Sequence, residues 1–238
     1  MLVLGVDTAT PAVSAGFAYI NLSEPDKSEP LVTGQSPAKA LGLVKVMQER
    51  ATLDARAHGE LLMPQVKEAA EAASVALTEL GAVVCGVGPG PFTGLRAGIA
   101  TASALAHALG ITVYSVCSLD ALAAQAYREA PLTVITDARR REVYWATYDA
   151  AGHRLTGPEV SRPDEVEVTG EVVIGPGVES YAAGQGWAAG PARYPQVGGL
   201  AAVALPRLVA GAEVLPPQPL YLRRPDVAEP SERKQVIP

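Results

Sequence analysis

Cysteine and aromatic residues are scarce in this sequence. Two of its 238 residues are cysteines, and 5% are aromatic. So few cysteines exclude a small scaffold held together by disulfides. Cys85 and Cys117 each lie in a short apolar run, which predicts buried free thiols. Because alanine is abundant, we expect the helices to pack closely through small side chains.

The sequence also lacks an excess of positive charge. Its formal net charge is −6 at pH 7, whereas a nucleic-acid-binding surface needs clustered lysine and arginine to neutralise phosphates. Residues 139–141 are the only dense basic run, which we interpret as a solvated turn beside a strand. The chain is therefore not expected to supply the main nucleic-acid-binding surface of a complex.

No apolar run in the sequence is long enough to span a bilayer. The first apolar stretch has no basic residues ahead of it, which argues against a signal peptide and favours the cytoplasm. A hydrophobic content of 48% with 18% charged residues is typical of a globular protein of one or two domains.

Residues 82–98, AVVCGVGPGPFTGLRAG, combine the strongest local signals of the chain. A β-branched run at 83–87 predicts a buried strand, and Gly-Pro-Gly-Pro at 88–91 predicts a sharp turn. Apolar residues then recur at helical spacing from Phe92 to Leu109. Proline at 89 and 91 removes two backbone donors, and no lysine follows the turn. A turn that only shapes the chain is thus favoured over a phosphate-binding loop.

Hydrophobic periodicity and turn residues predict the remaining elements. We expect a helix over 62–80, ended by Gly81, and a helix over 119–129 with Ser118 as its N-cap. Residues 21–37 resemble a flexible insertion, residues 41–56 are helical or extended, and the tail 225–238 is expected to be poorly ordered. The other expected strands are 2–7, 13–19, 111–117, 132–136, 142–148 and 171–174, and the other expected helices start at 178 and span 200–210.

Neither a metal site nor a protease site is indicated by the sequence. His58, His107 and His153 are far apart, and none has a second ligand at metal-binding spacing. The candidate nucleophilic serines lack a surrounding motif such as G-x-S-x-G. His58-Gly-Glu60 is better interpreted as the start of a helix, with Glu60 favourably placed against its dipole.

The segment 88–98, GPGPFTGLRAG, closely resembles GPGSFTGLRIG, the signature of the bacterial TsaB (YeaZ) family. Further matches occur in the family's order at residues 6–11 (VDTATP), 58–64 (HGELLMP), 115–123 (SVCSLDALA) and 221–223 (YLR). Pro91 and Gly59 each replace the family's usual serine, and the stretch before His58 is unusually long.

This resemblance implies an α/β protein with the two-lobed actin-like ATPase (ASKHA) fold, in which both lobes are ribonuclease-H-like. The expected lobes are residues 1–109 and 110–216, with 217–238 able to return to the first. Both halves have an acidic hairpin turn, at Asp7 and at Asp137, and Gly175 lies where a turn contacting adenosine is expected.

The nucleotide cleft of such a fold is degenerate in this sequence. Neither acidic turn has the glycine that lets backbone approach phosphate, and a proline interrupts the glycines after Gly175. We expect that the chain does not hydrolyse ATP alone and binds no cofactor tightly, with ATP and metal bound by partner subunits. The simpler alternative, that both aspartates only cap tight hairpins, remains open. The residues of this candidate cleft are Asp7, Thr8, Thr10, Asp137 and Gly175.

The resemblance also implies partners. In the family, the helices that here begin near His58 and Phe92 bind the catalytic subunit TsaD, or a second copy when TsaD is absent. A large side chain at Gly94 or Gly98 would then abolish TsaD binding and leave the chain folded. The expected interface residues are His58, Glu60, Leu61, Phe92, Thr93, Gly94, Arg96, Ala97, Gly98 and Thr101.

The expected function is that of a non-catalytic subunit in the synthesis of threonylcarbamoyladenosine in tRNA. The chain would activate TsaD and bridge it to the ATPase TsaE, and it would meet tRNA only through the complex. Two other classes of protein remain open: a free-standing actin-like small-molecule kinase, and a homodimeric scaffold without a role in modification.

Overall fold

The computed structural model describes residues 1–21, 40, 42–126, 130–175, 178–187, 193–211 and 214–223. Two predicted segments lie outside these residues: the insertion 21–37, apart from Asn21, and the tail 225–238. The end of the predicted helix at 127–129 and the turn residues 176–177 also lie outside them.

A five-stranded sheet forms the first lobe, in the order β3-β2-β1-β4-β5. β1, β2 and β3 are antiparallel neighbours, whereas β4 and β5 run parallel to β1. Of the undecided stretch 41–56, residues 44–53 are extended and supply the edge strand β3. The strands are β1 (Leu2–Asp7), β2 (Ala12–Ile20), β3 (Val44–Leu53), β4 (Leu80–Gly86) and β5 (Thr112–Val116).

A four-stranded sheet forms the second lobe and repeats the first four positions of this order, as β8-β7-β6-β9. Asp7 is the last residue of β1, and Asp137 lies near the end of β6. The duplication and the two-lobed α/β architecture expected from the resemblance are confirmed. The strands are β6 (Leu132–Arg139), β7 (Glu142–Tyr148), β8 (Arg154–Ser161) and β9 (Glu171–Ile174).

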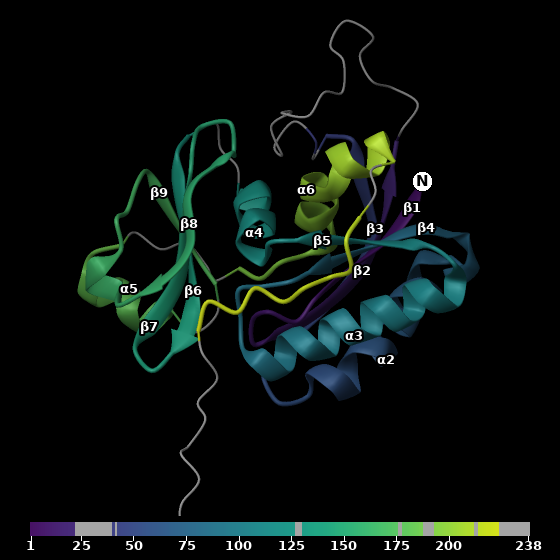
Figure 1. Cartoon of the computed structure of the whole chain (residues 1–238), viewed down its shortest axis with the longest axis horizontal. Coiled ribbons are helices and arrows are strands. Elements are labelled where there is room, and N and C mark those ends of the chain that lie inside the picture. Colours follow the sequence, from purple (N-terminus) through teal and green to yellow (C-terminus); the bar gives the residue numbers. More distant parts are fainter. Residues whose placement is uncertain are drawn as a thin grey trace, which may run out of the picture.

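Helices cover both faces of the first sheet (Figure 1). α2 (His58–Ala73) and α3 (Phe92–Leu109) lie side by side on one face, and α6 (Val197–Ala210) covers the other. α4 (Ser118–Ala126) lies between the two sheets, and α5 (Glu179–Gln185) packs on the second lobe. Two short 3₁₀ turns complete the order: η1 (Leu77–Glu79) and η2 (Pro163–Glu165).

The lobe boundary expected at residue 109 is wrong. β5 pairs with β4 and completes the first sheet, and α6 packs on that sheet although it comes late in the sequence. The physical reason is that a sheet with parallel strands must be covered on both faces, and α2 and α3 cover only one. Segment 217–223 does return to the first lobe, where the N–H of Leu220 donates to the carbonyl of Val87 at 2.8 Å.

The helix expected over 62–80 ends earlier, at Ala73. Ser74 adopts a left-handed conformation, with φ of 54°, and caps the helix, while Gly81 lies inside β4. The helical spacing of apolar residues continued past Ser74 because Val75 and Leu77, beyond the helix, pack on the same core. In the described residues, no helix is both long and apolar enough to cross a membrane.

Replacing Leu200 with alanine tests whether α6 belongs to the first lobe. Leu200 is fully buried against the first sheet, so we expect the free energy of unfolding to fall by about 2–5 kcal/mol. Leu215, which is 81% exposed, is the control, and its alanine variant should differ from the wild type by less than about 0.5 kcal/mol. Urea denaturation with hydrogen exchange checks both variants. Loss of amide protection in β6–β9 rather than in β1–β5 would contradict the assignment.

Candidate functional site

The turn after β1 is closed rather than open to ligands. The carboxylate of Asp7 is fully buried and accepts two hydrogen bonds. Ser118 Oγ, at the start of α4, donates to Asp7 Oδ2 at 2.5 Å, and the N–H of Ala9 donates to Oδ1 at 2.9 Å. Gly86 lies directly above, and a Cβ atom there would overlap Asp7 Oδ2. The expectation that Ser118 is the N-cap of α4 is therefore wrong. Its hydroxyl instead donates to Asp7 and accepts the N–H of Gly88.

The next residues of this turn bind the starts of α2 and α3. Thr8 Oγ1 donates to the carbonyl of Gly94 at 2.7 Å, and His58 Nε2 lies 2.9 Å from the carbonyl oxygen of Thr10. Thr8 and Thr10 are buried, as is His58. The turn 7–10 therefore joins the first turns of three helices and leaves no side chain of its own at the surface.

The second acidic turn is built in the same way but is more open. Asp137 is half-buried, and its Oδ1 accepts the N–H of Arg139 at 3.0 Å, as Asp7 accepts that of Ala9. An aspartate that binds the N–H two residues ahead stabilises a tight turn. Gly175 is buried, and its N–H donates to the carbonyl of Ile135 at 2.7 Å. The candidate cleft residues thus serve mainly as turn and strand contacts.

Gly94 and Gly98, two of the ten expected interface residues, are not exposed to a partner. Both glycines are buried, and a Cβ atom at either would collide with Thr8. Small residues do permit close approach to α3, but the neighbour is the β1–β2 turn of the same chain. A large side chain at either position would disturb the fold itself, which corrects the expectation that such variants stay folded.

The other expected interface residues remain accessible around the starts of α2 and α3. Of the ten, His58, Gly94 and Gly98 are buried. The exposed ones are Glu60, Phe92, Thr93 and Arg96, and the half-buried ones are Leu61, Ala97 and Thr101.

Tyr221, which is not among the expected interface residues, adds a second aromatic ring to this surface. Tyr221, from the C-terminal segment, stacks on Phe92 with ring centroids 4.8 Å apart. The guanidinium group of Arg96 lies over the Phe92 ring, 3.7 Å from its centroid, and Arg96 Nε donates to Tyr221 Oη at 3.1 Å. The match of residues 221–223 to the family motif was the only signal in the sequence that could have pointed to Tyr221.

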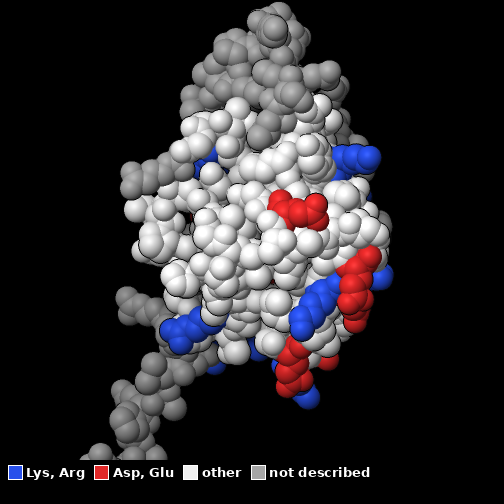
Figure 2. Space-filling model, turned by 90° about the vertical axis from the view of Figure 1, so that its right-hand side faces the viewer, with Lys and Arg blue, Asp and Glu red and all other residues white. Residues whose placement is uncertain are grey.

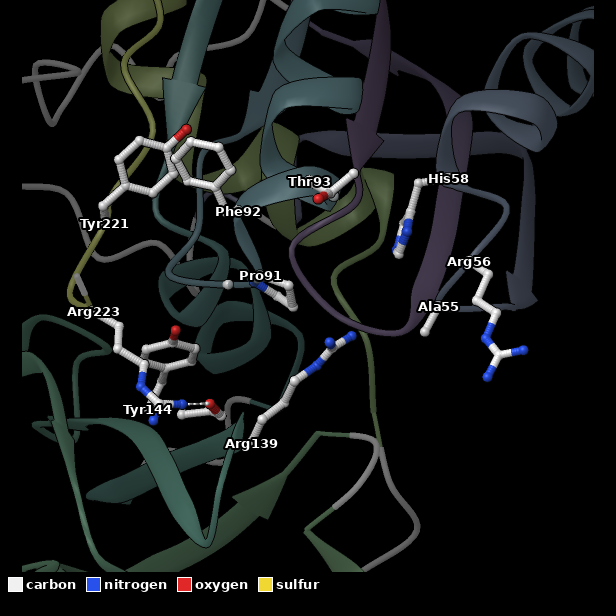
Figure 3. A pocket seen from close by; sticks show the side chains of 13 residues that line it. Ala55, Arg56, His58, Pro91, Phe92, Thr93, Arg139, Tyr144, Tyr221 and Arg223 are labelled. Atoms are coloured by element: carbon white, nitrogen blue, oxygen red, sulfur yellow. Dashed lines mark hydrogen bonds between the residues drawn. The ribbon is translucent and has the colours of Figure 1, made fainter. Parts of the chain in front are cut away.

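A cavity of about 750 Å³ lies beside this cluster, between the start of α3 and the β6–β7 hairpin. Arg139 extends into it from the hairpin toward Pro91, and Tyr144 and Arg223 line the same, hairpin side of the cavity (Figure 3). Arg223 donates to the carbonyl of Ala138 at 2.9 Å. The described residues that line the cavity include three arginines and no acid, and the α3 N-terminus adds a partial positive charge. This arrangement can accommodate an anionic group.

Such a concentration of arginine is local. On the face shown in Figure 2, basic and acidic side chains lie next to each other along one edge, and most of the remaining described surface is uncharged. Among the described residues there is no group of three or more histidine, cysteine, aspartate or glutamate side chains placed to hold a metal ion.

Comparisons with known proteins agree with this geometry. Residues 49–215 match the family model described as TsaD, tRNA N6-adenosine threonylcarbamoyltransferase. The chain is 34% identical over 143 residues to the tRNA threonylcarbamoyladenosine biosynthesis protein TsaB of Escherichia coli, covering 57% of this chain and 61% of that protein. Its structure is similar to YeaZ from Pseudomonas aeruginosa, with a TM-score of 0.67 and 27% identity over 93% of this chain and 99% of the other. The chain belongs to the TsaB (YeaZ) family.

The chain is also similar to an uncharacterised protein of Mycobacterium tuberculosis. It is 44% identical over 224 residues, which cover 94% of this chain and 92% of the relative. The match to this relative and the structural match to YeaZ both extend over nearly the whole length of the chain.

Asp7 makes the stability of the fold depend on pH. Burial raises the pKa of its carboxyl from 3.8 to about 6, although the Ser118 and Ala9 hydrogen bonds oppose this. The folded state thus holds a proton that the unfolded state has released between these two pH values. Stability should fall as the pH rises from about 4 to 6, by up to about 3 kcal/mol from this group.

Replacing Asp7 with asparagine removes this titration. We expect the difference in unfolding free energy between the wild type and Asp7→Asn to change with this sign between pH 4 and 7, and chemical denaturation at each pH measures it. A difference that stays constant over this range would show that the Asp7 carboxyl titrates alike in the folded and unfolded states.

Gly98→Ala tests the close approach of α3 to the β1–β2 turn. The added Cβ atom would displace Thr8 Oγ1 from its bond with Gly94, so we expect a loss of about 1–3 kcal/mol of stability. Gly59→Ala is the matched control in α2, since nothing lies within 4 Å of its Cβ position. It should stabilise the protein by about 0.5–1 kcal/mol. Thermal or urea unfolding checks both, and equal effects at the two glycines would contradict the packing described here.

Proposed function

We propose that this chain is a non-catalytic subunit in the biosynthesis of threonylcarbamoyladenosine in tRNA, and that it binds a TsaD-type transferase. Its family membership and the names of its relatives support this role. The observation that carries the proposal is the closed turn at Asp7. The carboxylate that could face a ligand in an open cleft is instead buried against Ser118 of α4. The neighbouring Thr8 donates to Gly94 of α3, the helix that carries the exposed Phe92.

The closed turn also argues against independent phosphoryl transfer. A kinase of this fold needs an acidic group that reaches Mg²⁺ and phosphate oxygens, but Asp7 is fully buried. A Cβ atom at Gly90, in the neighbouring turn, would collide with the backbone of Ala9, so these two turns already contact each other. We therefore assign ATP and metal to partner subunits.

We place the transferase on a docking surface at the starts of α2 and α3. Phe92 and Tyr221 are 37% and 38% exposed, and aromatic and arginine side chains dominate the energy of many protein interfaces. Arg96 holds both rings in place before a partner arrives, which lowers the entropy lost on binding. The docking surface comprises Glu60, Leu61, Phe92, Thr93, Arg96, Ala97, Thr101 and Tyr221.

The same surface would serve a second copy of the chain when the transferase is absent. A homodimer and the complex with the transferase would then exclude each other. We further propose that the complex engages a TsaE-type ATPase, with the present chain as the bridge, and that it works in the cytoplasm. The role of the chain would be to favour the active conformation of the transferase through contacts made only in that state.

Phe92→Ala tests the docking surface. Removing a central aromatic anchor should weaken binding to the transferase of the same organism by at least about tenfold, which corresponds to about 1.4 kcal/mol. Leu155→Ala is the control, because Leu155 is 63% exposed but lies on β8 of the second lobe. Calorimetry measures the affinities, and light scattering follows the exchange of homodimer for heterodimer. Wild-type affinity in a folded Phe92→Ala variant would place the interface elsewhere.

A further inference from the structure

The β6–β7 hairpin holds three consecutive arginines in a conformation that does not favour them. Arg139, Arg140 and Arg141 have φ values of 62°, 53° and 63°. Positive φ at both loop residues, here Arg140 and Arg141, is typical of the tight two-residue hairpin turn that favours Asn-Gly. Side chains larger than glycine are strained in this region. Strain of this kind persists only where the surrounding structure enforces it, and it occurs often at functional sites.

Two of these arginines line a second hollow, on the second lobe. Arg140 and Arg141, together with Arg162 beside η2, border a space of about 580 Å³ that Tyr181 of α5 also lines. All three arginines are exposed. The two acids at this hollow are Glu142 and Asp164, and Glu142 is paired with Arg223 at 3.1 Å. Three arginines and two acids thus line this hollow, in a chain whose net charge is −6.

We propose that this arginine hollow, formed by Arg140, Arg141 and Arg162, binds the phosphate backbone of tRNA. This inference rests on the proposed function, which brings the chain to a tRNA substrate. The planar guanidinium group matches the geometry of phosphate with two parallel hydrogen bonds. The half-buried ring of Tyr181 offers a surface on which a base can stack. The hollow would thus give the chain a direct contact with tRNA, beyond the indirect one expected from sequence.

RNA is favoured over an acidic protein segment by the chemistry of the hollow. Its basic groups are all arginines, two on the β6–β7 hairpin and one beside η2. Several arginines side by side can contact successive phosphates of a nucleic-acid backbone. Protein interfaces with fixed carboxylates gain little from exposed ion pairs, whereas phosphate contacts also release condensed counterions. Affinity that depends strongly on salt is therefore the signature of the proposed occupant.

The test replaces Arg140 with asparagine and Arg141 with glycine in the full-length chain. Because Asn-Gly suits this turn, the variant should unfold at or above the wild-type temperature, so a loss of binding cannot be ascribed to misfolding. An unmodified tRNA transcript is titrated with the chain, with and without the transferase, at several salt concentrations. We expect roughly tenfold weaker binding near 0.1 M salt and a log–log salt slope smaller by about 2.

Arg50→Gln is the matched control, since Arg50 is an exposed arginine on β3 of the other lobe. It should leave both affinity and slope unchanged, and Arg162→Gln should lower the slope by about 1. An Asn-Gly variant with the wild-type affinity and slope would overturn the inference. So would a variant that keeps its affinity for tRNA and loses the transferase, because the hollow would then be a protein contact.

Association with the transferase is measured separately by light scattering. If the wild-type chain does not associate, the proposed function fails, and the hollow is judged from the titrations of the chain alone. Weaker binding and a smaller slope in those titrations would still support the phosphate contact.

Discussion

The hydrogen bonds of the β1–β2 turn are the constraint on which the rest of the first lobe depends. Asp7 binds Ser118 of α4, Thr8 binds Gly94 of α3, and the carbonyl of Thr10 binds His58 of α2. All these groups are buried, and buried polar groups without partners destabilise the fold strongly. The bonds therefore fix the starts of three helices together, and the glycines at 86, 94 and 98 provide the space in which they form.

This arrangement supports the role of a binding subunit proposed above for an actin-like fold. The aspartate that ends β1 makes its hydrogen bonds within the protein and does not face an open cleft. Its burial is unfavourable for the charged form, which is why the pKa of Asp7 is raised. In return, the first turns of α2 and α3 are held rigidly, so the exposed residues Phe92 and Arg96 are ordered before any partner binds. A rigid surface loses less entropy on association than a flexible one.

Local patterns in the sequence predicted where helices and strands form better than they predicted which of these elements pack together. The β4–turn–α3 unit and the acidic hairpins were found because their signals lie within a few residues. The packing of α6 on the first sheet could not be predicted from local signals, because it depends on which face of the sheet the other helices leave uncovered. The strand β8 was not predicted, because Gly157 and Pro158 interrupt its apolar pattern. The family resemblance assigned Gly94 and Gly98 to the interface, but nothing in the sequence showed that Thr8 packs against both.

The C-terminal segment shows why the two candidate surfaces are not independent. Tyr221 stacks on Phe92 of the first lobe, and two residues later Arg223 binds the carbonyl of Ala138 and the carboxylate of Glu142 on the second. Residues 221–223 thus join the docking surface to the β6–β7 hairpin (Figure 1). Groups that share partners in this way do not contribute additively. A partner that displaced Tyr221 would also disturb Arg223, and with it the charge balance at Glu142 beside the arginine hollow.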